Sequence, residues 1–528
     1  MKVRSLGTLF DDVVARGIRT VVHLDRPLDL APLRGTRFDL PAVAALVRET
    51  AGALHAAGVG PGDSVAVVKE NHWDYVLIAA AAARLGAVPA LLSDHLTPES
   101  LQVLLKRLEP TALVTTRAVL DDGHEHGIDL TSLVGRTVCL DGEQDGAVSL
   151  ASLRGTPPPP PVERAPDAPL VVNHTSGTTG LPKLVVHTTR TLLHGIAAAE
   201  ATRVPVVSTR ASDTACSAIA FSHGRAVPWT ASVLSLGPRE LVVVSDAENA
   251  GPVLREHPPT TVEALPSTYV RWMPMTGPDG PFRGVRLYVS TFDAMHPPTV
   301  RAYLGATARR GPLWLQVWGQ TETGPLTFRV LTRRALAAAE RRHPTTRDLG
   351  RPVPGRTRLR VVDPRTFAEL PPGAPGLVLV RTPVVCVGYV GEHDRWHAKW
   401  NDGWWNTGDV GVRTPLGAFR LLDREVDLIP GHSGVELEDV IEDRVPGVVE
   451  CVVLGTPGTT PVPVLVTRDG TLDVWAWRAA QYDLPPLAEP VVLTWEQVPR
   501  TGTGKVRRME LREVVHRGQD TYGTGLWT

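Results

Sequence analysis

The sequence predicts an α/β fold with a large N-terminal domain at residues 1–423 and a small α+β domain at residues 424–528. Helical and β-branched segments alternate over the first hundred residues, and shorter helices and strands alternate after residue 424. A length of 528 residues is also more than one folding unit usually holds. We therefore expect parallel α/β units first and a separate small core at the end.

The first α/β units are predicted from two periodicities. Apolar residues spaced by three and four indicate helices, and β-branched runs between turn residues indicate strands. Strands that alternate with helices in this way are typical of parallel sheets. The expected segments are a helix at 41–58, a strand at 64–71, a helix at 73–87, a strand at 88–94, and a helix followed by a strand within 98–116.

Later segments complete the predicted architecture. A proline-rich connector at 155–168 precedes a buried strand at 169–173. Three β-rich runs between residues 360 and 391, separated by Pro and Gly, predict a small β-subdomain inside the large domain. The small domain is expected to contain a helix at 435–445, strands at 448–455 and 462–467, and a helix at 472–481.

Composition excludes several classes of function. The 55 basic and 56 acidic side chains give a net charge of -1, without the basic excess of nucleic-acid-binding proteins. The four cysteines lie far apart, which argues against a disulfide framework and favours a reducing, cytoplasmic setting. The apolar stretch 75–92 contains Arg84, so we expect a buried helix and strand there and not a membrane span. Neither nucleic acid nor a membrane is an expected partner.

The run from His174 to Lys183 has the chemistry of a phosphate-binding loop. Glycines permit close backbone approach to a phosphate, hydroxyls donate hydrogen bonds, and a lysine adds a positive charge. Lysine is scarce in this chain, with six among 55 basic residues, so composition alone explains Lys183 poorly. The predicted phosphate-binding residues are Thr175, Ser176, Gly177, Thr178, Thr179, Gly180 and Lys183.

Four further motifs follow in order along the chain. They are WGQTETG at 318–324, NTGD at 406–409, an imperfect DREVDLI at 423–429 and PRTGTGK at 499–505. Together with TSGTTGLPK, they make the chain from about residue 38 to 512 resemble the adenylate-forming superfamily of acyl-CoA synthetases, amino-acid adenylation domains and luciferases. The resemblance implies an enzyme that uses ATP and Mg²⁺, with a small mobile C-terminal domain.

The resemblance assigns roles to individual residues of this sequence. Trp318 would pack beside adenine, Thr321 would contact the α-phosphate, and Glu322 would bind Mg²⁺, which prefers such oxygen ligands. Asp409, expected on a tight Asn-Thr-Gly turn, would accept from the ribose hydroxyls, and Arg424 would add a ribose or phosphate contact. The remaining residues are the catalytic Lys505, expected between the substrate and the α-phosphate, and the pocket residues His223, Arg225 and Gly319.

The three pocket residues lead to more specific expectations. Gly319 stands at a position where acetate-specific relatives have a bulky residue. The glycine therefore implies a pocket deeper than acetate needs. Arg225 is interpreted either as facing a carboxylate or polar substituent of the substrate or as forming a surface salt bridge.

The chain departs from the family pattern at segments outside the adenylation motifs. Ser290 to Ala294 stands where relatives have a Gly-Gly turn against adenine, and Val426 occupies the hinge position. The loop 430–434 is short, and Ile441 replaces the terminal Glu of the following helix pattern. The adenylation residues are thus intact, whereas the segments that rotate to admit coenzyme A are altered.

Three hypotheses of function follow. The first is ATP- and Mg²⁺-dependent activation of a carboxylic acid larger than acetate as its acyl-adenylate, followed by transfer to coenzyme A or to a carrier-protein thiol. The second keeps AMP activation but changes the second step, to nitrite-dependent diazotisation of an aryl amine or to β-lactone closure. The third is a non-catalytic nucleotide-binding or scaffold protein, against which the joint presence of Lys183, Glu322, Asp409 and Lys505 argues.

Overall fold

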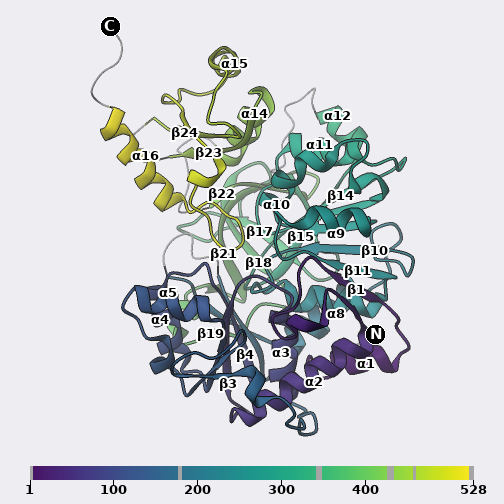
Figure 1. Cartoon of the computed structure of the whole chain (residues 1–528). Helices are drawn as coiled ribbons and strands as arrows, with labels where there is room; N and C mark the ends of the chain where they lie inside the picture. The colour runs from purple at the N-terminus through teal and green to yellow at the C-terminus, as the bar shows by residue number, and fades with distance from the viewer. Residues whose placement is uncertain (1–3, 176–180, 340–347, 425–432, 456–459, 523–528) are drawn as a thin grey trace.

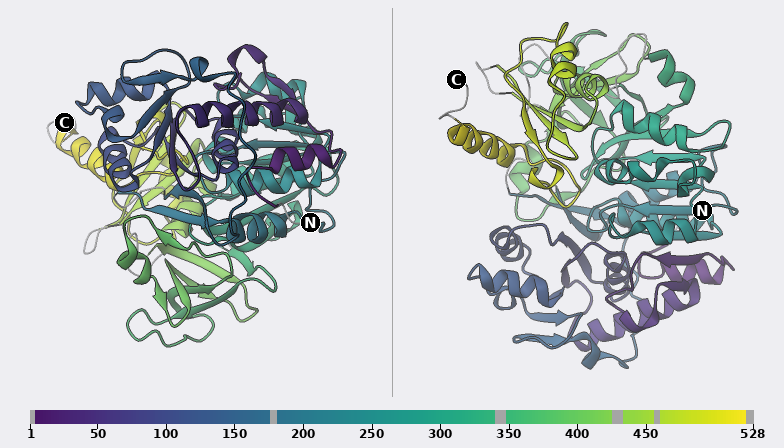
Figure 2. Two further views of the ribbon diagram at one scale, coloured as in Figure 1. Left: turned by 90° about the horizontal axis from the view of Figure 1, so that it is seen from below. Right: turned by 45° about the horizontal axis from the view of Figure 1, so that its top comes forward.

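The computed structural model describes residues 4–175, 181–339, 348–424, 433–455 and 460–522. The strands within these ranges form sheets of 14, eight and three strands. The N-terminal helices lie at the bottom of Figure 1, in purple and blue, and the yellow C-terminal elements lie together at its top left. The right view of Figure 2 shows the same yellow unit above the teal and purple layers. The α/β fold class is confirmed.

The 14-stranded sheet has a parallel and an antiparallel part. In the strand order given at the end of this paragraph, each strand from β14 to β1 is parallel to its neighbour. The strands from β17 to β15 are antiparallel to their neighbours. The antiparallel part contains the predicted β-subdomain. The order across the sheet is β17 (Arg358–Val362), β18 (Pro375–Arg381), β21 (Trp404–Arg413), β22 (Phe419–Arg424), β16 (Asp348–Pro352), β15 (Gly324–Leu331), β14 (Leu313–Gln320), β13 (Leu287–Ser290), β12 (Thr261–Ala264), β10 (Thr214–Ala218), β11 (Glu240–Val243), β1 (Val21–Leu24) and β2 (Arg37–Asp39), with β20 (Trp400–Asn401) beside β21.

The eight-stranded sheet contains the first predicted α/β units. Strands from β8 to β7 in the order below are parallel, as the helix–strand alternation predicts. The order is β19 (Gly388–Tyr389), β9 (Leu184–Thr188), β8 (Pro169–His174), β4 (Val88–Ser93), β3 (Ser64–Lys69), β5 (Ala112–Thr115), β6 (Arg136–Cys139) and β7 (Ala147–Ser149).

Helices cover and join these sheets. The α-helices before the C-terminal part are α1 (Leu9–Ala15), α2 (Leu40–Ala56), α3 (Asp74–Arg84), α4 (Pro98–Leu108), α5 (Arg117–Glu125), α6 (Thr189–Thr191), α7 (Ala198–Glu200), α8 (Ala226–Leu236), α9 (Ala250–Glu256), α10 (Pro266–Trp272), α11 (Pro297–Ala306), α12 (Arg333–Ala339) and α13 (His393–His397). One buried apolar cluster includes residues of α2, α3 and α8 together with strands of both sheets, so these helices bind the two sheets into one core.

Helix α3 is buried along its whole length. The predicted buried helix is therefore confirmed, and its charged residue has a partner, because Arg84 donates to Asp11 Oδ2 over 2.7 Å. Among the described residues, no helix is both long and apolar enough to cross a bilayer.

The C-terminal part forms its own small α+β layer. It contains β23 (Val448–Leu454), β24 (Val462–Thr467), β25 (Val491–Leu493), α14 (Gly434–Arg444), α15 (Val474–Ala480) and α16 (Arg508–Tyr522). The four predicted elements are present, and β25 and α16 are additional. The hinge position Val426 and most of the loop 430–434 lie outside the described residues, so the domain boundary near residue 423 stays a prediction.

Two local predictions are wrong. The run 384–390 was expected in the β-subdomain, but β19 pairs with β9 in the other sheet, Gly388 opposite Val186. The NTGD motif lies inside strand β21 and not on a tight turn, because its backbone pairs with neighbouring strands on both sides.

Candidate active site

The base of the glycine- and threonine-rich loop is closed by two hydrogen bonds. The backbone N–H of Thr175 donates to the carbonyl of Lys183 over 3.0 Å, and the N–H of Lys183 donates to Thr175 Oγ1 over 3.1 Å. This pairing joins the end of β8 to the start of β9 and fixes the direction in which Lys183 leaves the sheet. Ser176, Gly177, Thr178, Thr179 and Gly180 lie outside the described residues, so their phosphate contacts stay predictions.

Lys183 and Glu322 form a buried ion pair. Lys183 Nζ lies 2.8 Å from Glu322 Oε1, and the hydroxyl of Tyr389 donates to the same oxygen over 2.9 Å. Burial raises the pKa of Glu322, but the charge and hydrogen bond of Lys183 outweigh it and hold the pKa below its usual value. Glu322 is therefore an ionised carboxylate, an oxygen ligand that would fit a hard divalent cation.

Thr321 lies between two histidines. His187 Nε2 donates to the carbonyl of Thr321 over 2.7 Å, and Thr321 Oγ1 lies 3.3 Å from His223 Nε2. Burial, followed by the charges of Lys505 and neighbouring groups, lowers the pKa of His223 to about 3, so its ring is neutral.

The neutral ring of His223 has a defined tautomer. Its Nδ1 accepts from the N–H of Arg225 over 3.1 Å, so the hydrogen is on Nε2 and is donated to Thr321. The hydroxyl hydrogen of Thr321 then remains to donate to a ligand.

Side-chain hydrogen bonds join the WGQTETG motif at the end of β14 to the NTGD motif in β21, although the two strands are not neighbours in the sheet. Gln320 Nε2 donates to Asp409 Oδ2 over 3.0 Å and to the carbonyl of Thr407 over 2.8 Å. Trp318 packs on Phe419 with ring centroids 4.7 Å apart. The backbone of Arg424 lies opposite Asp409 in the β21–β22 pair, and its side chain is outside the described part.

Lys505 reaches the large domain from the C-terminal part. The loop before it is closed by the N–H of Thr501, which donates to the carbonyl of Lys505 over 2.8 Å. Arg507 Nη2 donates to the carbonyl of His95 over 2.8 Å and ties the loop to the eight-stranded sheet region. Lys505 lines the same cavity as Thr321 and His223. The structure thus brings the predicted catalytic lysine to the other motif residues.

A cavity of about 440 Å³ extends from these residues into the 14-stranded sheet. Its apolar and aromatic lining includes Trp229, Phe292, Phe328 and Leu315. Gly319 lines it too, but a Cβ there would lie 2.1 Å from the carbonyl oxygen of Gly324. The glycine is therefore required by the close β14–β15 hairpin, whatever it contributes to pocket depth.

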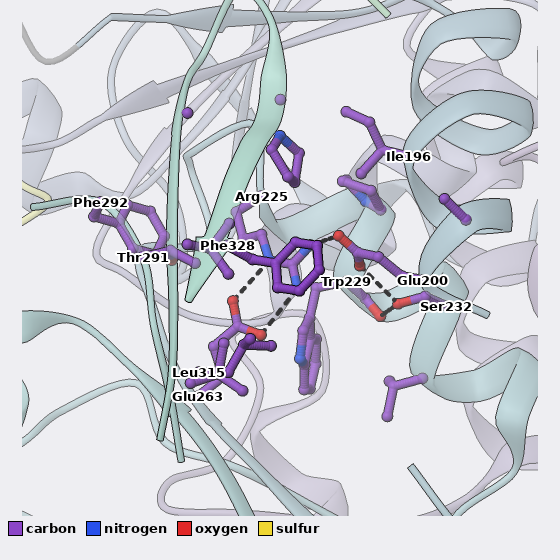
Figure 3. Close-up of a pocket in the computed structure, with 18 of the residues that line it drawn as sticks. Ile196, Glu200, Arg225, Trp229, Ser232, Glu263, Thr291, Phe292, Leu315 and Phe328 are labelled. Carbon is purple, nitrogen blue, oxygen red and sulfur yellow. Dashed lines mark hydrogen bonds and ion pairs between the residues drawn. The ribbon is translucent and has the colours of Figure 1, made fainter. Parts of the chain in front are cut away.

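Arg225 is buried in the wall of this cavity, so the predicted surface salt bridge is wrong. Its Nε and Nη2 donate to Glu263 Oε1 and Oε2 over 2.7 and 2.9 Å, and its Nη1 pairs with Glu200 (Figure 3). Burial and the nearby Glu263 charge raise the pKa of Glu200 despite the pairing with Arg225.

Sequence reasoning missed Glu200, Glu263, Tyr389 and Phe292 as site residues. A charged residue within the apolar strand TVEA at 261–264 was an available signal for Glu263. Phe292 has a positive φ of 79° and packs on His223 at 4.7 Å, in the segment that departs from the family pattern. Nothing in the local pattern distinguished Tyr389, because it reads as an ordinary strand residue.

The fold and these motif residues define an adenylate-forming enzyme. The family model described as AMP-binding enzyme matches residues 32–390, and the chain belongs to this family. It is 36% identical to 3-amino-2-hydroxy-4-methoxybenzoate diazotase from Streptomyces cremeus, over 97% of this chain and 95% of the relative. It is 24% identical to 3-aminoavenalumate diazotase from a Streptomyces species, over 92% and 93% of the two chains.

A solved structure has the same fold along nearly the whole chain. The anthranilate CoA ligase AuaEII, in complex with anthranoyl-AMP, superposes with a TM-score of 0.81 at 20% identity, covering 98% of both chains. At this identity the likeness shows the fold alone.

Proposed function

We propose that this protein is an ATP-dependent diazotase, which activates nitrite with AMP and transfers the nitroso group to an aromatic amine. The observation that carries the proposal is the 36% identity with a diazotase over 97% of the chain. Supporting it, Thr321 and Lys505 line a cavity whose apolar, aromatic-lined space is of a size that suits a substituted benzene ring. The segments that depart from the family pattern agree with a second step other than thioester formation.

The first step forms a mixed anhydride of nitrite and AMP. A nitrite oxygen attacks the α-phosphorus of ATP, a new O–P bond forms, and the bond to pyrophosphate breaks. Lys505 would stabilise the negative charge that accumulates on the α-phosphate oxygens, and Thr321 would donate its hydroxyl hydrogen to one of them. Asp409 would bind the ribose, and Trp318 would pack beside the adenine.

The second step is attack by the aromatic amine on the nitrogen of the anhydride. An N–N bond forms, the N–O bond breaks and AMP leaves with its electron pair. The amine nitrogen loses a proton, and the resulting N-nitrosamine tautomerises to a diazohydroxide. The hydroxyl of the diazohydroxide then takes up one proton, which balances the proton that the amine released, and water leaves to give the diazonium group. No oxidant or reductant is needed.

A divalent cation has a fitting position in this scheme. Glu322 is buried, ionised and next to Lys183, and Mg²⁺ bound there would screen the charge of the triphosphate. Lys183 would interact with the phosphates as a point charge.

Activation of an aromatic carboxylic acid, with coenzyme A or a carrier protein as the acceptor, is the second candidate function. The position of Lys505 in the cavity favours acid activation as much as nitrite activation, since a carboxylate and a nitrite ion are both anionic nucleophiles for the α-phosphorus. The two candidates differ in the co-substrate on which AMP formation depends.

One experiment separates them. The purified protein is incubated with ATP and Mg²⁺ and with either nitrite plus an aminohydroxybenzoate or the same acid plus coenzyme A. We expect AMP, pyrophosphate and a diazo product in equal amounts with nitrite, measured by chromatography and mass spectrometry. Acyl-CoA formed in amounts equal to AMP, with no diazo product, would overturn the diazotase proposal.

Lysine variants test whether the cavity carries the chemistry. Lys505→Ala should lower the rate of AMP formation at least about 100-fold, because the α-phosphate loses its charge partner. Lys106→Ala removes an exposed lysine of α4 and should leave the rate unchanged. A Lys505→Ala enzyme as fast as the Lys106→Ala control would contradict the assigned site.

A further inference from the structure

Three charged side chains meet in the wall of the cavity, away from the motifs of the nucleotide site. They come from three elements: Glu200 from the end of α7, Arg225 from the residue before α8, and Glu263 from β12. Figure 3 shows Arg225 between the two glutamates, with Trp229 beside it. We call these three residues the Arg225 cluster.

The Arg225 cluster carries an excess of negative charge. One guanidinium faces two carboxylates, and Arg225 uses three of its five N–H groups on them. Uncompensated charge in an apolar wall is costly, so such a cluster is stabilised by a further hydrogen-bond donor. An anionic group of a ligand would face a net negative charge here and would be repelled.

Glu200 is the member with acceptor capacity to spare. Its side chain is 25% exposed, whereas that of Glu263 is 6% exposed. Both oxygens of Glu263 accept from Arg225. Glu200 has one oxygen on Arg225, and its Oε2 has a long hydrogen bond of 3.3 Å from Ser232. A carboxylate accepts about four hydrogen bonds, so Glu200 can accept from a ligand in the cavity.

We propose that the Arg225 cluster binds a hydroxyl or amino substituent on the aromatic ring of the substrate, with Glu200 as the acceptor. The inference rests on the proposed function, because the substituent is a second group on an aromatic amine whose first nitrogen reacts. Arg225, itself fixed by Glu263, pairs with Glu200 and holds its carboxyl group in place. The enzyme then selects aromatic amines by a second hydrogen-bond donor as well as by ring shape.

The test is a coupling measurement between the substituent and Glu200. Binding of aniline and of 2-, 3- and 4-aminophenol to the protein without ATP or nitrite is measured by isothermal titration calorimetry. At least one aminophenol should bind about tenfold or more tightly than aniline, as a hydrogen bond to a charged acceptor provides. In Glu200→Gln this advantage should fall to about threefold or less, while aniline affinity changes little.

A matched control keeps the measurement specific. Glu248→Gln changes an exposed glutamate that pairs with Arg271 over 3.1 Å outside the cavity lining. This variant should retain the full hydroxyl advantage, that is, the tighter binding of an aminophenol than of aniline. Thermal unfolding of each variant establishes that it folds, and Glu263→Gln serves as a second variant if Glu200→Gln does not.

Two results would overturn the proposal. One is equal affinity of the wild-type protein for aniline and for all three aminophenols. The other is a hydroxyl advantage that survives in whichever cluster variant folds. Because no nucleotide or nitrite is present, the hydroxyl advantage is measurable whether or not the enzyme forms a diazonium. If the enzyme forms a diazo product but the tighter binding of aminophenol does not depend on Glu200, this inference is overturned and the proposed function stands.

Discussion

At the scale of single residues, the Glu322 carboxylate accepts hydrogen bonds from two side chains. A bound nucleotide would compete with Glu322 for these donors. Lys183 and Tyr389 both donate to its Oε1. A bound triphosphate attracts the ammonium of Lys183, and the carboxylate left behind would then hold a cation. Without a nucleotide, the ion pair compensates both charges in this partly buried site.

Glu322→Gln tests this role. The amide oxygen can still accept from Lys183 and Tyr389, but the negative charge is gone. We expect the Mg²⁺ concentration that gives half-maximal ATP binding to rise about tenfold or more, measured by ATP titration at a series of Mg²⁺ concentrations. Glu392→Gln, which alters a glutamate paired with Arg107 outside the cavity lining, is the control. An unchanged Mg²⁺ dependence in Glu322→Gln would refute the role.

The sequence predicted many of the residues that meet in the site, and it did so through ordered motifs. Lys183 pairs with Glu322, Asp409 accepts from Gln320, and Lys505 lines the same cavity as Thr321. The Arg225 cluster was not predictable as a unit, because its members are partners only after α7, α8 and β12 pack together. Its charge balance depends on tertiary distances that no local pattern encodes.

At the scale of elements, the loop 501–505 positions Lys505 through its glycines. Gly504 has a φ of +75°, and a Cβ there would lie 2.0 Å from Ser267 Oγ. A side chain would strain the loop by about 1 kcal/mol and push it from the large domain. The glycine-rich sequence is thus a requirement of close docking and of backbone conformation together.

Gly504→Ala should separate docking from nucleotide binding. We expect AMP formation to fall about tenfold or more, because Lys505 leaves its position, while ATP affinity measured by calorimetry stays within about twofold. Gly470→Ala is a matched control in the C-terminal part, since Gly470 also has a positive φ of 72° but its nearest contact is 3.5 Å away. Equal losses of activity in both variants would show that strain alone, and not docking, is responsible.

Local periodicity was sufficient for most helices and for the parallel strands, because each α/β unit is built from residues close in sequence. It failed for β19 and for the NTGD segment, whose strand pairing is made with distant residues. The two-residue strand β19 also brings Tyr389 beside Glu322, so the same long-range pairing that escaped prediction supplies a site residue.

At the scale of the whole molecule, the C-terminal part is held on the large domain by an ionic contact between α11 and α14. His296, just before α11, lies 2.6 Å from Asp439 and 3.4 Å from Glu442 on α14, and Arg301 pairs with Asp443. This contact stabilises the arrangement in which Lys505 lines the cavity. Any rotation of the C-terminal part has to break it.

The contact depends on the charge of His296. Burial lowers the pKa of His296, but the carboxylates of Glu442 and Asp439 outweigh burial and raise it to about 10. A pKa raised above the unfolded value of about 6.5 gives stability that is fully present below that value. The stabilisation is therefore lost as the pH rises from about 6.5 through about 10.

His296→Gln should consequently lower the thermal midpoint most near pH 6 and least above pH 10. We expect a difference from wild type of about 2 °C or more at pH 6 that shrinks steadily toward pH 10.5, measured by scanning calorimetry at constant ionic strength. His393→Gln, which changes an exposed histidine at the start of α13, should show no such difference. A His296→Gln difference that is the same at every pH would mean that the histidine acts by shape and not by charge, and the domain contact would then be independent of alkaline titration.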